Sequence, residues 1–182
     1  ARGIGGHALK ERETVDPSDR DDLWRQFGAA LDMLENAMRA CPAGLWGDRE
    51  REPQFWYLAY HTLFWLDYYL SESPDGFAPP SPFGMEEFDP AGVLPPRVYA
   101  RDELLAYLEH GRRKARQAIA SLGAPGTAPR FRSGWMDFSR LELHLYNLRH
   151  VQHGAGQLNL LLRQAGHESP RWARRARDEG KG

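Results

Sequence analysis

The sequence lacks the features that mark several large classes of protein. It contains one cysteine, Cys41, which excludes an internal disulfide and a multi-cysteine zinc site and fits a reducing cytoplasm. No apolar run approaches the roughly 20 residues that a membrane-spanning helix needs, and the first residues lack the apolar core of a signal peptide. The formal net charge of −1 gives no reason to expect nucleic acid or an acidic membrane as a partner. We therefore expect a cytoplasmic protein that binds neither.

What the chain does contain suits one globular domain with a bulky core. Its 182 residues are 41% hydrophobic and 12% aromatic. Residues 1–18 include a charged ERETVD segment without periodic apolar positions, so we expect a flexible arm there. Residues 19–168 form the predicted domain. Residues 169–182 are a basic tail that we expect to fray.

Four segments have apolar residues at helical spacing. They are residues 19–41, which follow Ser18 as a capping residue, and residues 53–70, 101–122 and 141–164. The second segment is apolar on nearly all sides, so it should lie at the centre. No segment has a strand pattern. The sequence therefore predicts an all-α fold, a four-helix bundle.

The connection between the second and third helices, residues 73–96, is long and rich in proline, glycine and phenylalanine. Long loops in compact domains are often functional. Phe77, Phe83 and Phe88 could fold back over an opening in the bundle. A packed surface loop explains the same residues equally well.

The last helix has a polar row beside its apolar face. Asn147, His150, His153 and Gln157 follow one another at steps of three or four, so their side chains lie along nearly one line. Burying such a line requires hydrogen-bond partners or a ligand.

Three histidines form a candidate metal site. His61 lies in the middle of the second helix, and His150 and His153 could converge on the same ion from the fourth. Three imidazoles with an open position suit a catalytic divalent metal. The alternative for His61 is a hydrogen-bonded core residue.

The other histidines are weaker candidates. His144 is about 120° around the helix from His150 and should face solvent or another helix. His110 begins a polar turn that is typical of a solvated face.

Three segments resemble the DinB/YfiT-like superfamily. They are YHTLFWLDYYL, NLRHVQHGAGQLNLLLRQ and FDPAGVLPPRVYARDELLAYLEHGRRK, so the similarity runs from the second helix to the end of the fourth. The resemblance implies helices in up-down-down-up order and a divalent metal, such as Zn, Ni or Fe, held by histidines at the open end. Some members are thiol S-transferases that use bacillithiol, mycothiol or glutathione, and others isomerise maleylpyruvate.

The metal ligands of the family carry over incompletely. His61 matches the ligand on the second helix and His150 matches the first on the fourth, but Gly154 stands where the last ligand is expected. His153 is only its neighbour. Three outcomes stay open: His153 completes a distorted site, water or a loop residue replaces the ligand, or the metal is lost and the pocket kept.

Two functions follow. The first is a metal-dependent thiol S-transferase in which His61, His150 and His153 bind the metal, with a low-molecular-weight thiol as cosubstrate and no catalytic residue assigned. The second is a metal-free bundle that binds a small molecule or forms a homodimer. In either case the expected contacts of the small-molecule substrate are Tyr57, Trp65, Tyr68, Asn147 and Gln157.

Overall fold

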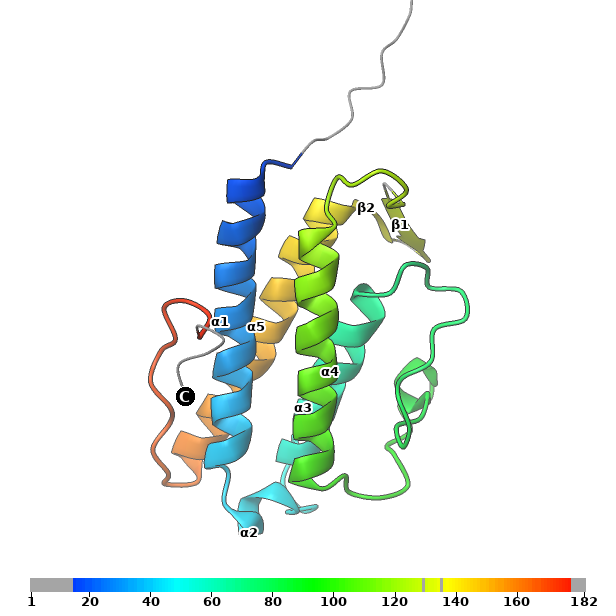
Figure 1. Ribbon diagram of the computed structural model, residues 1–182. Coiled ribbons are helices and arrows are strands. Elements are labelled where there is room, and N and C mark those ends of the chain that lie inside the picture. Colours follow the sequence, from blue (N-terminus) through cyan, green and yellow to red (C-terminus); the bar gives the residue numbers. More distant parts are fainter. Residues whose placement is uncertain (1–14, 129, 135, 178–182) are drawn as a thin grey trace, which may run out of the picture.

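The computed structural model describes residues 15–128, 130–134 and 136–177, and four long helices packed side by side dominate it (Figure 1). The predicted all-α character is confirmed for most of this chain. The elements in order are α1 (Pro17–Ala40), α2 (Ala43–Trp46), α3 (Phe55–Tyr69), the 3₁₀ helix η1 (Glu86–Phe88), α4 (Arg101–Ala120), β1 (Arg130–Ser133), β2 (Met136–Ser139) and α5 (Arg140–Gln164).

The four long helices share one core, and α3 has the largest share of buried residues among them. Helix α1 packs against α4 and α5, and α3 packs against the same two helices. The side chains of Trp56, Tyr60 and Phe64 on α3 are fully buried. Because α3 is apolar on nearly every side, it is buried on most of its surface, and its partly exposed side chains are those of Tyr57, His61 and Trp65.

The long connection between α3 and α4 packs its phenylalanines on the aromatic face of α3. Phe83 stacks on Tyr60 of α3, with ring centroids 6.0 Å apart, and on Tyr107 of α4, with ring centroids 4.4 Å apart. Phe77 and Phe88 both contact the ring of Phe64, at centroid distances of 5.4 Å and 5.2 Å. These contacts hold η1, which lies in this connection, against α3.

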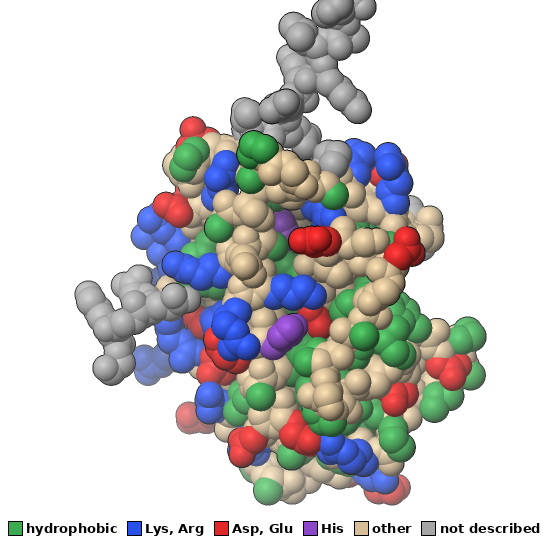
Figure 2. Space-filling model, turned by 45° about the vertical axis from the view of Figure 1, so that its right-hand side comes forward, with side chains coloured by type: hydrophobic (Ala, Val, Ile, Leu, Met, Phe, Trp, Pro, Cys, Tyr) green, Lys and Arg blue, Asp and Glu red, His purple; other side chains and the backbone are tan. Residues whose placement is uncertain are grey.

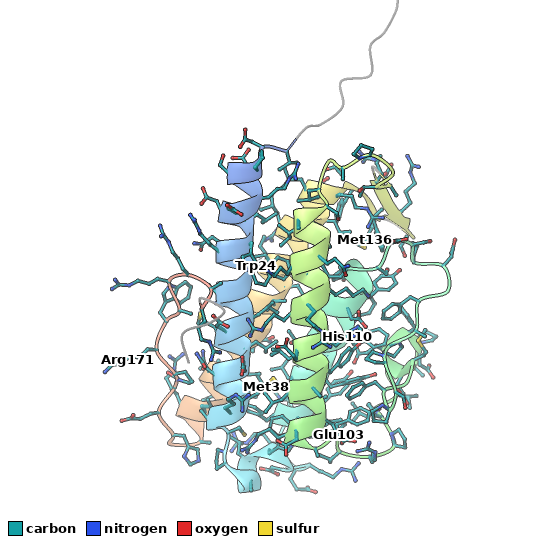
Figure 3. All side chains as sticks on the ribbon, viewed as in Figure 1. Trp24, Met38, Glu103, His110, Met136 and Arg171 are labelled. Atoms are coloured by element: carbon teal, nitrogen blue, oxygen red, sulfur yellow. The ribbon has the colours of Figure 1, made fainter. Side chains whose placement is uncertain are left out.

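A buried carboxylate links α3 to α4. Asp67 is 1% exposed and accepts a hydrogen bond of 2.5 Å from the Lys114 ammonium, while Nε2 of His110 lies 3.4 Å from the same oxygen. His110 points from α4 toward α3 and the long connection (Figure 3). The His110 side chain is 38% exposed, as its expected place on a solvated face implies, and its Nε2 atom also faces the buried Asp67 carboxylate.

The segment before α5 contains a short antiparallel hairpin, although no segment of the sequence has a strand pattern. Strands β1 and β2 pair with Phe131 opposite Phe138. Arg130 Nε and the Asp137 carboxylate lie 2.6 Å apart across the pair. Strands of four residues are too short to show a clear alternating pattern, so periodicity could not predict this hairpin.

Helices α1 and α5 each begin at a side-chain cap. The Asp16 carboxylate accepts a hydrogen bond from the Ser18 amide at 2.8 Å, so α1 begins at Pro17, one residue before the predicted cap Ser18. Ser139 caps α5 through the Glu142 amide. Residues 1–14 of the predicted arm lie outside the described residues.

The described part of the basic tail packs along α1 instead of fraying. Figure 1 shows this segment, in orange and red, returning beside α1. The Ala176 amide donates to the Arg25 carbonyl at 2.8 Å, and the Arg177 amide donates to the buried Asp32 carboxylate at 2.8 Å. Gly28 permits this approach, since a Cβ there would lie 2.5 Å from that of Ala176.

Within the described residues, no helix is long and apolar enough to cross a membrane. This agrees with the absence of a long apolar run in the sequence.

His144 on α5 is a buried histidine, with 3% of its surface exposed. Burial, together with the nearby charge of Arg140, lowers its pKa from 6.5 to about 4. The unfolded chain therefore binds a proton at a pH where the folded chain does not. The stability that neutral His144 provides is complete above pH 6.5 and is lost as the pH falls toward 4.

We predict that His144→Gln reduces this acid sensitivity. Between pH 6.5 and pH 4, the wild type should lose up to roughly 3 kcal/mol of unfolding free energy through His144, and the variant should not. Urea unfolding at both pH values measures the difference. His167→Gln, which changes an exposed histidine, is the matched control. Equal losses in wild type and His144→Gln would contradict the prediction.

Candidate functional site

A cavity of about 340 Å³ lies between α3 and α5. This volume falls in the range of small-molecule sites. The cavity collects the three histidines predicted as metal ligands, together with two of the predicted substrate contacts. Its lining residues are Pro53, Tyr57, Leu58, His61, Thr62, His150, His153, Gly154 and Gln157.

His61 is held by a carboxylate from the long connection. Its Nδ1 lies 2.6 Å from the Glu87 Oε2 atom. The Glu87 side chain is 4% exposed, whereas that of His61 is 40% exposed. Among the described residues, Nε2 of His61 has no hydrogen-bond partner. One nitrogen of the ring is therefore anchored, and the other is free to meet a ligand.

Glu87 is ionised although it is buried. The Trp65 indole donates to the same Oε2 atom at 2.8 Å. Burial acts to raise the pKa of Glu87, but the hydrogen bonds from His61 and Trp65 outweigh it and hold the pKa below its ordinary value. The same environment acts on Tyr57, where burial and the Glu87 charge raise the pKa to about 12. The site therefore contains a fixed carboxylate and a protonated phenol.

His150 lies opposite His61 across the cavity. The two ring centroids are 5.7 Å apart, and the edge of the His150 ring packs against Tyr69. His150 Nε2 lies 3.2 Å from the Thr62 carbonyl oxygen. Burial, and next the charge of His61, lower the pKa of His150 to about 4. At neutral pH this ring is uncharged and donates to the backbone of α3.

The donor set of the cavity does not fit a three-ligand metal site. His153 is exposed, and one nitrogen of each of the other two histidines is already hydrogen-bonded. Across the described parts of the chain, no group of three or more His, Cys, Asp or Glu side chains is placed to hold a metal ion.

Gly154 is where α5 comes closest to α3. A Cβ at this position would lie 2.2 Å from Thr62 Oγ1 and 2.7 Å from Thr62 Cγ2. Thr62 is fully buried, and its hydroxyl donates to the Leu58 carbonyl at 2.8 Å. With the helices at this spacing, position 154 has no room for a ligand side chain.

The predicted substrate contacts fall into two groups. Tyr57 and Gln157 line the cavity. Asn147 is fully buried and donates to the Leu66 carbonyl at 3.0 Å, which joins α5 to α3. Trp65 binds Glu87, and the Tyr68 hydroxyl bonds to the Ser133 hydroxyl, so neither is among the cavity-lining residues.

Sequence reasoning missed Glu87. Its signal was the acidic pair in FGMEEFDP, where phenylalanines on both sides can pull a carboxylate into an apolar interface. A loop residue has no helical register, so the sequence could not place it against His61.

We predict that Gly154→Ala destabilises the protein by about 1–3 kcal/mol, because the added methyl group overlaps Thr62. Gly156→Ala is the matched control on the same helix. No atom lies within 4 Å of its new Cβ, so it should gain about 1 kcal/mol from helix propensity. Thermal or urea unfolding measures both variants.

The same prediction can be checked by a double-mutant cycle. Thr62→Ala removes the two atoms that overlap most, so Gly154→Ala should cost less in that background. An equal cost in both backgrounds would show that the close approach is not the cause.

Comparison with known proteins agrees with the architecture. A search of curated proteins finds no match. The model of one protein family, described as the DinB superfamily, matches residues 26–158, which include most of α1, all of α3 and α4, and the histidines of α5. The match covers well over half of the chain and confirms the resemblance seen in the sequence. The chain belongs to the DinB superfamily.

Proposed function

We propose that this protein binds a small molecule in the cavity between α3 and α5 and that His61 removes a proton from it. The observation that carries the proposal is the bond between His61 Nδ1 and the buried, ionised Glu87. We also propose that the long helices α1, α3, α4 and α5 follow the up-down-down-up order of the superfamily. In that order α3 and α4 run in the same direction, and the long connection between them supports it.

The carboxylate selects one tautomer of His61. A hydrogen bond of 2.6 Å to Glu87 favours the proton on Nδ1, which leaves the lone pair on Nε2. The Glu87 charge also stabilises the imidazolium that forms when His61 accepts a proton. A histidine oriented in this way by a carboxylate is suited to general-base catalysis.

The rest of the cavity supports a binding role. His150 is neutral, so it does not oppose the formation of a positive charge at His61. Tyr57 keeps its proton at neutral pH and interacts through it with Glu87, and the Gln157 amide can donate to a bound substrate.

A low-molecular-weight thiol, such as glutathione, mycothiol or bacillithiol, is the substrate class that the superfamily resemblance suggests first. In that reaction the S–H proton passes to His61 Nε2, the thiolate sulfur bonds to an electrophilic carbon, and the leaving group departs with the electrons of its bond. The thiolate is the reactive form, so a base beside the thiol accelerates the step.

The second candidate is the metal-dependent thiol S-transferase. It is favoured by the carboxylate behind His61, an arrangement that also orients metal ligands, and by His150 at 5.7 Å between ring centroids. It requires a third ligand, either His153 after a change of side-chain position or an atom of the substrate. A non-catalytic ligand-binding bundle is the remaining alternative.

We predict that NMR of histidine-labelled protein, recorded where the imidazoles are neutral, shows His61 protonated on Nδ1. In Glu87→Ala the ring should revert to the Nε2-protonated form that free histidine prefers. Asp89→Ala is the control, because it removes a carboxylate from the same connection without touching His61. His61 protonated on Nε2 in the wild type would rule out the proposed base.

His150→Gln separates the two candidate functions. The Gln amide can still donate to the Thr62 carbonyl but replaces a metal-binding nitrogen. If His61 acts as a base, His61→Ala should lower thiol transfer at least about 100-fold, whereas His150→Gln should retain most of it. Loss of activity in both variants, with loss of one bound equivalent of zinc measured by elemental analysis, would establish the metal-dependent alternative.

A further inference from the structure

A second cavity, of about 700 Å³, lies beside the first two turns of α5. The last turns of α4, the residues after α3 and the segment before the hairpin enclose it. Arg140 and His144 belong to this cavity, whereas His150 and Gln157, further along α5, belong to the first one. The space-filling view shows the surface hollowed on the side of α3 and α4, with basic, acidic and histidine side chains around the depression (Figure 2).

His144 forms part of the wall of this cavity and has no partner there. It is 3% exposed, and its Nδ1 atom is buried without a hydrogen-bond partner among the described residues. Buried imidazoles are normally hydrogen-bonded, because an unpaired buried polar group costs about 1–3 kcal/mol. A residue of this kind at the wall of a cavity indicates a missing hydrogen-bond partner.

Arg140 lies four residues before His144, on the same side of α5. Its guanidinium donates to three carbonyl oxygens, those of Ala128, Ser71 and Glu72. Among the described residues, none of its partners is a carboxylate. Three bonds leave two of its five N–H groups unused. The Arg140 charge is therefore solvated by dipoles but not neutralised.

Lys114, the other basic side chain of the cavity, is paired already. Its ammonium donates to the Asp67 carboxylate at 2.5 Å and to the Asp67 carbonyl at 3.1 Å. Glu72, at the exposed rim, carries the only other charge among the lining residues. Arg140 is thus a cation that no described carboxylate hydrogen-bonds, and the charge of Glu72 at the rim attracts it from a distance.

The remaining walls determine the shape of the ligand. Leu70, Leu122 and Pro125 provide apolar surface. A neutral apolar ligand would cover these residues but would leave Arg140 and His144 unpaired, and an inorganic anion would pair them but leave the apolar walls uncovered. A molecule with both parts satisfies the whole cavity.

We propose that this cavity binds a small organic acid, whose carboxylate lies between Arg140 and His144 and whose apolar body covers Leu70, Leu122 and Pro125. The carboxylate accepts from the two free N–H groups of Arg140 and from the imidazole. The site is separate from the His61 cavity and does not depend on the function proposed for it.

Phenylacetate is a suitable probe, and phenylacetamide is its uncharged match in shape. Titration of the full-length, histidine-labelled protein, followed by NMR, should show a saturable shift of the His144 signals with phenylacetate. Phenylacetamide should bind at least about tenfold more weakly, because it lacks the charge-assisted hydrogen bonds. The signals of His61 and His150 should not move.

Two variants test the contribution of charge. Arg140→Gln should weaken phenylacetate binding at least about tenfold, whereas Arg113→Gln, which removes an exposed arginine elsewhere on α4, should not. Glu72→Gln removes the opposing charge at the rim and should strengthen binding. It keeps the test informative if Arg140→Gln, which also loses three contacts to the backbone, does not fold.

The proposal is overturned by any of three results. The first is an unchanged His144 signal at saturating probe. The second is equal binding of phenylacetate and phenylacetamide. The third is binding that Glu72→Gln does not strengthen and that Arg140→Gln and Arg113→Gln weaken equally.

Discussion

The close approach of α5 to α3 at Gly154 and Thr62 sets the geometry of the whole interior. Without a side chain at position 154, the two helices come near enough for Asn147 and His150 to bond to carbonyl oxygens of α3. These bonds satisfy one nitrogen of Asn147 and one of His150, which would otherwise be costly to bury, whereas Asn147 Oδ1 is buried without a partner among the described residues. They also fix the 5.7 Å separation of the His61 and His150 rings.

The contact between Gly154 and Thr62 also limits which side chains can reach the cavity between α3 and α5. Space that a third ligand would need is occupied by the Thr62 side chain, and His150 uses one nitrogen for a structural bond. The partner of His61 comes instead from the connection between α3 and α4. Glu87 can stay ionised inside an aromatic interface because His61 and Trp65 both donate to it. A buried carboxylate is tolerated only with such partners.

Sequence patterns identified the four long helices because each repeats apolar residues over several turns, and burial against neighbours is what that repeat encodes. They also identified Gly154 as the departure from the family pattern, but not its reason, since the contact with Thr62 joins residues far apart in the chain. Sequence patterns did not predict Glu87 or the hairpin, because a connecting segment and two short strands show little periodicity. The surroundings of His144 depend on where α4 ends and how the next segment returns, which helical spacing alone does not determine.

The carboxylate that orients His61 is carried by the chain between two helices and not by the bundle itself. Helices must preserve their packing surfaces, whereas a surface connection tolerates insertions and exchange. The helix bundle and the side chain that bonds to His61 can therefore be changed independently by protein engineering. Grafting a different connection between Leu70 and Arg101 offers a way to install another acid, an amide or an apolar residue against His61, and so to redirect the reactivity of one bundle without redesigning its core.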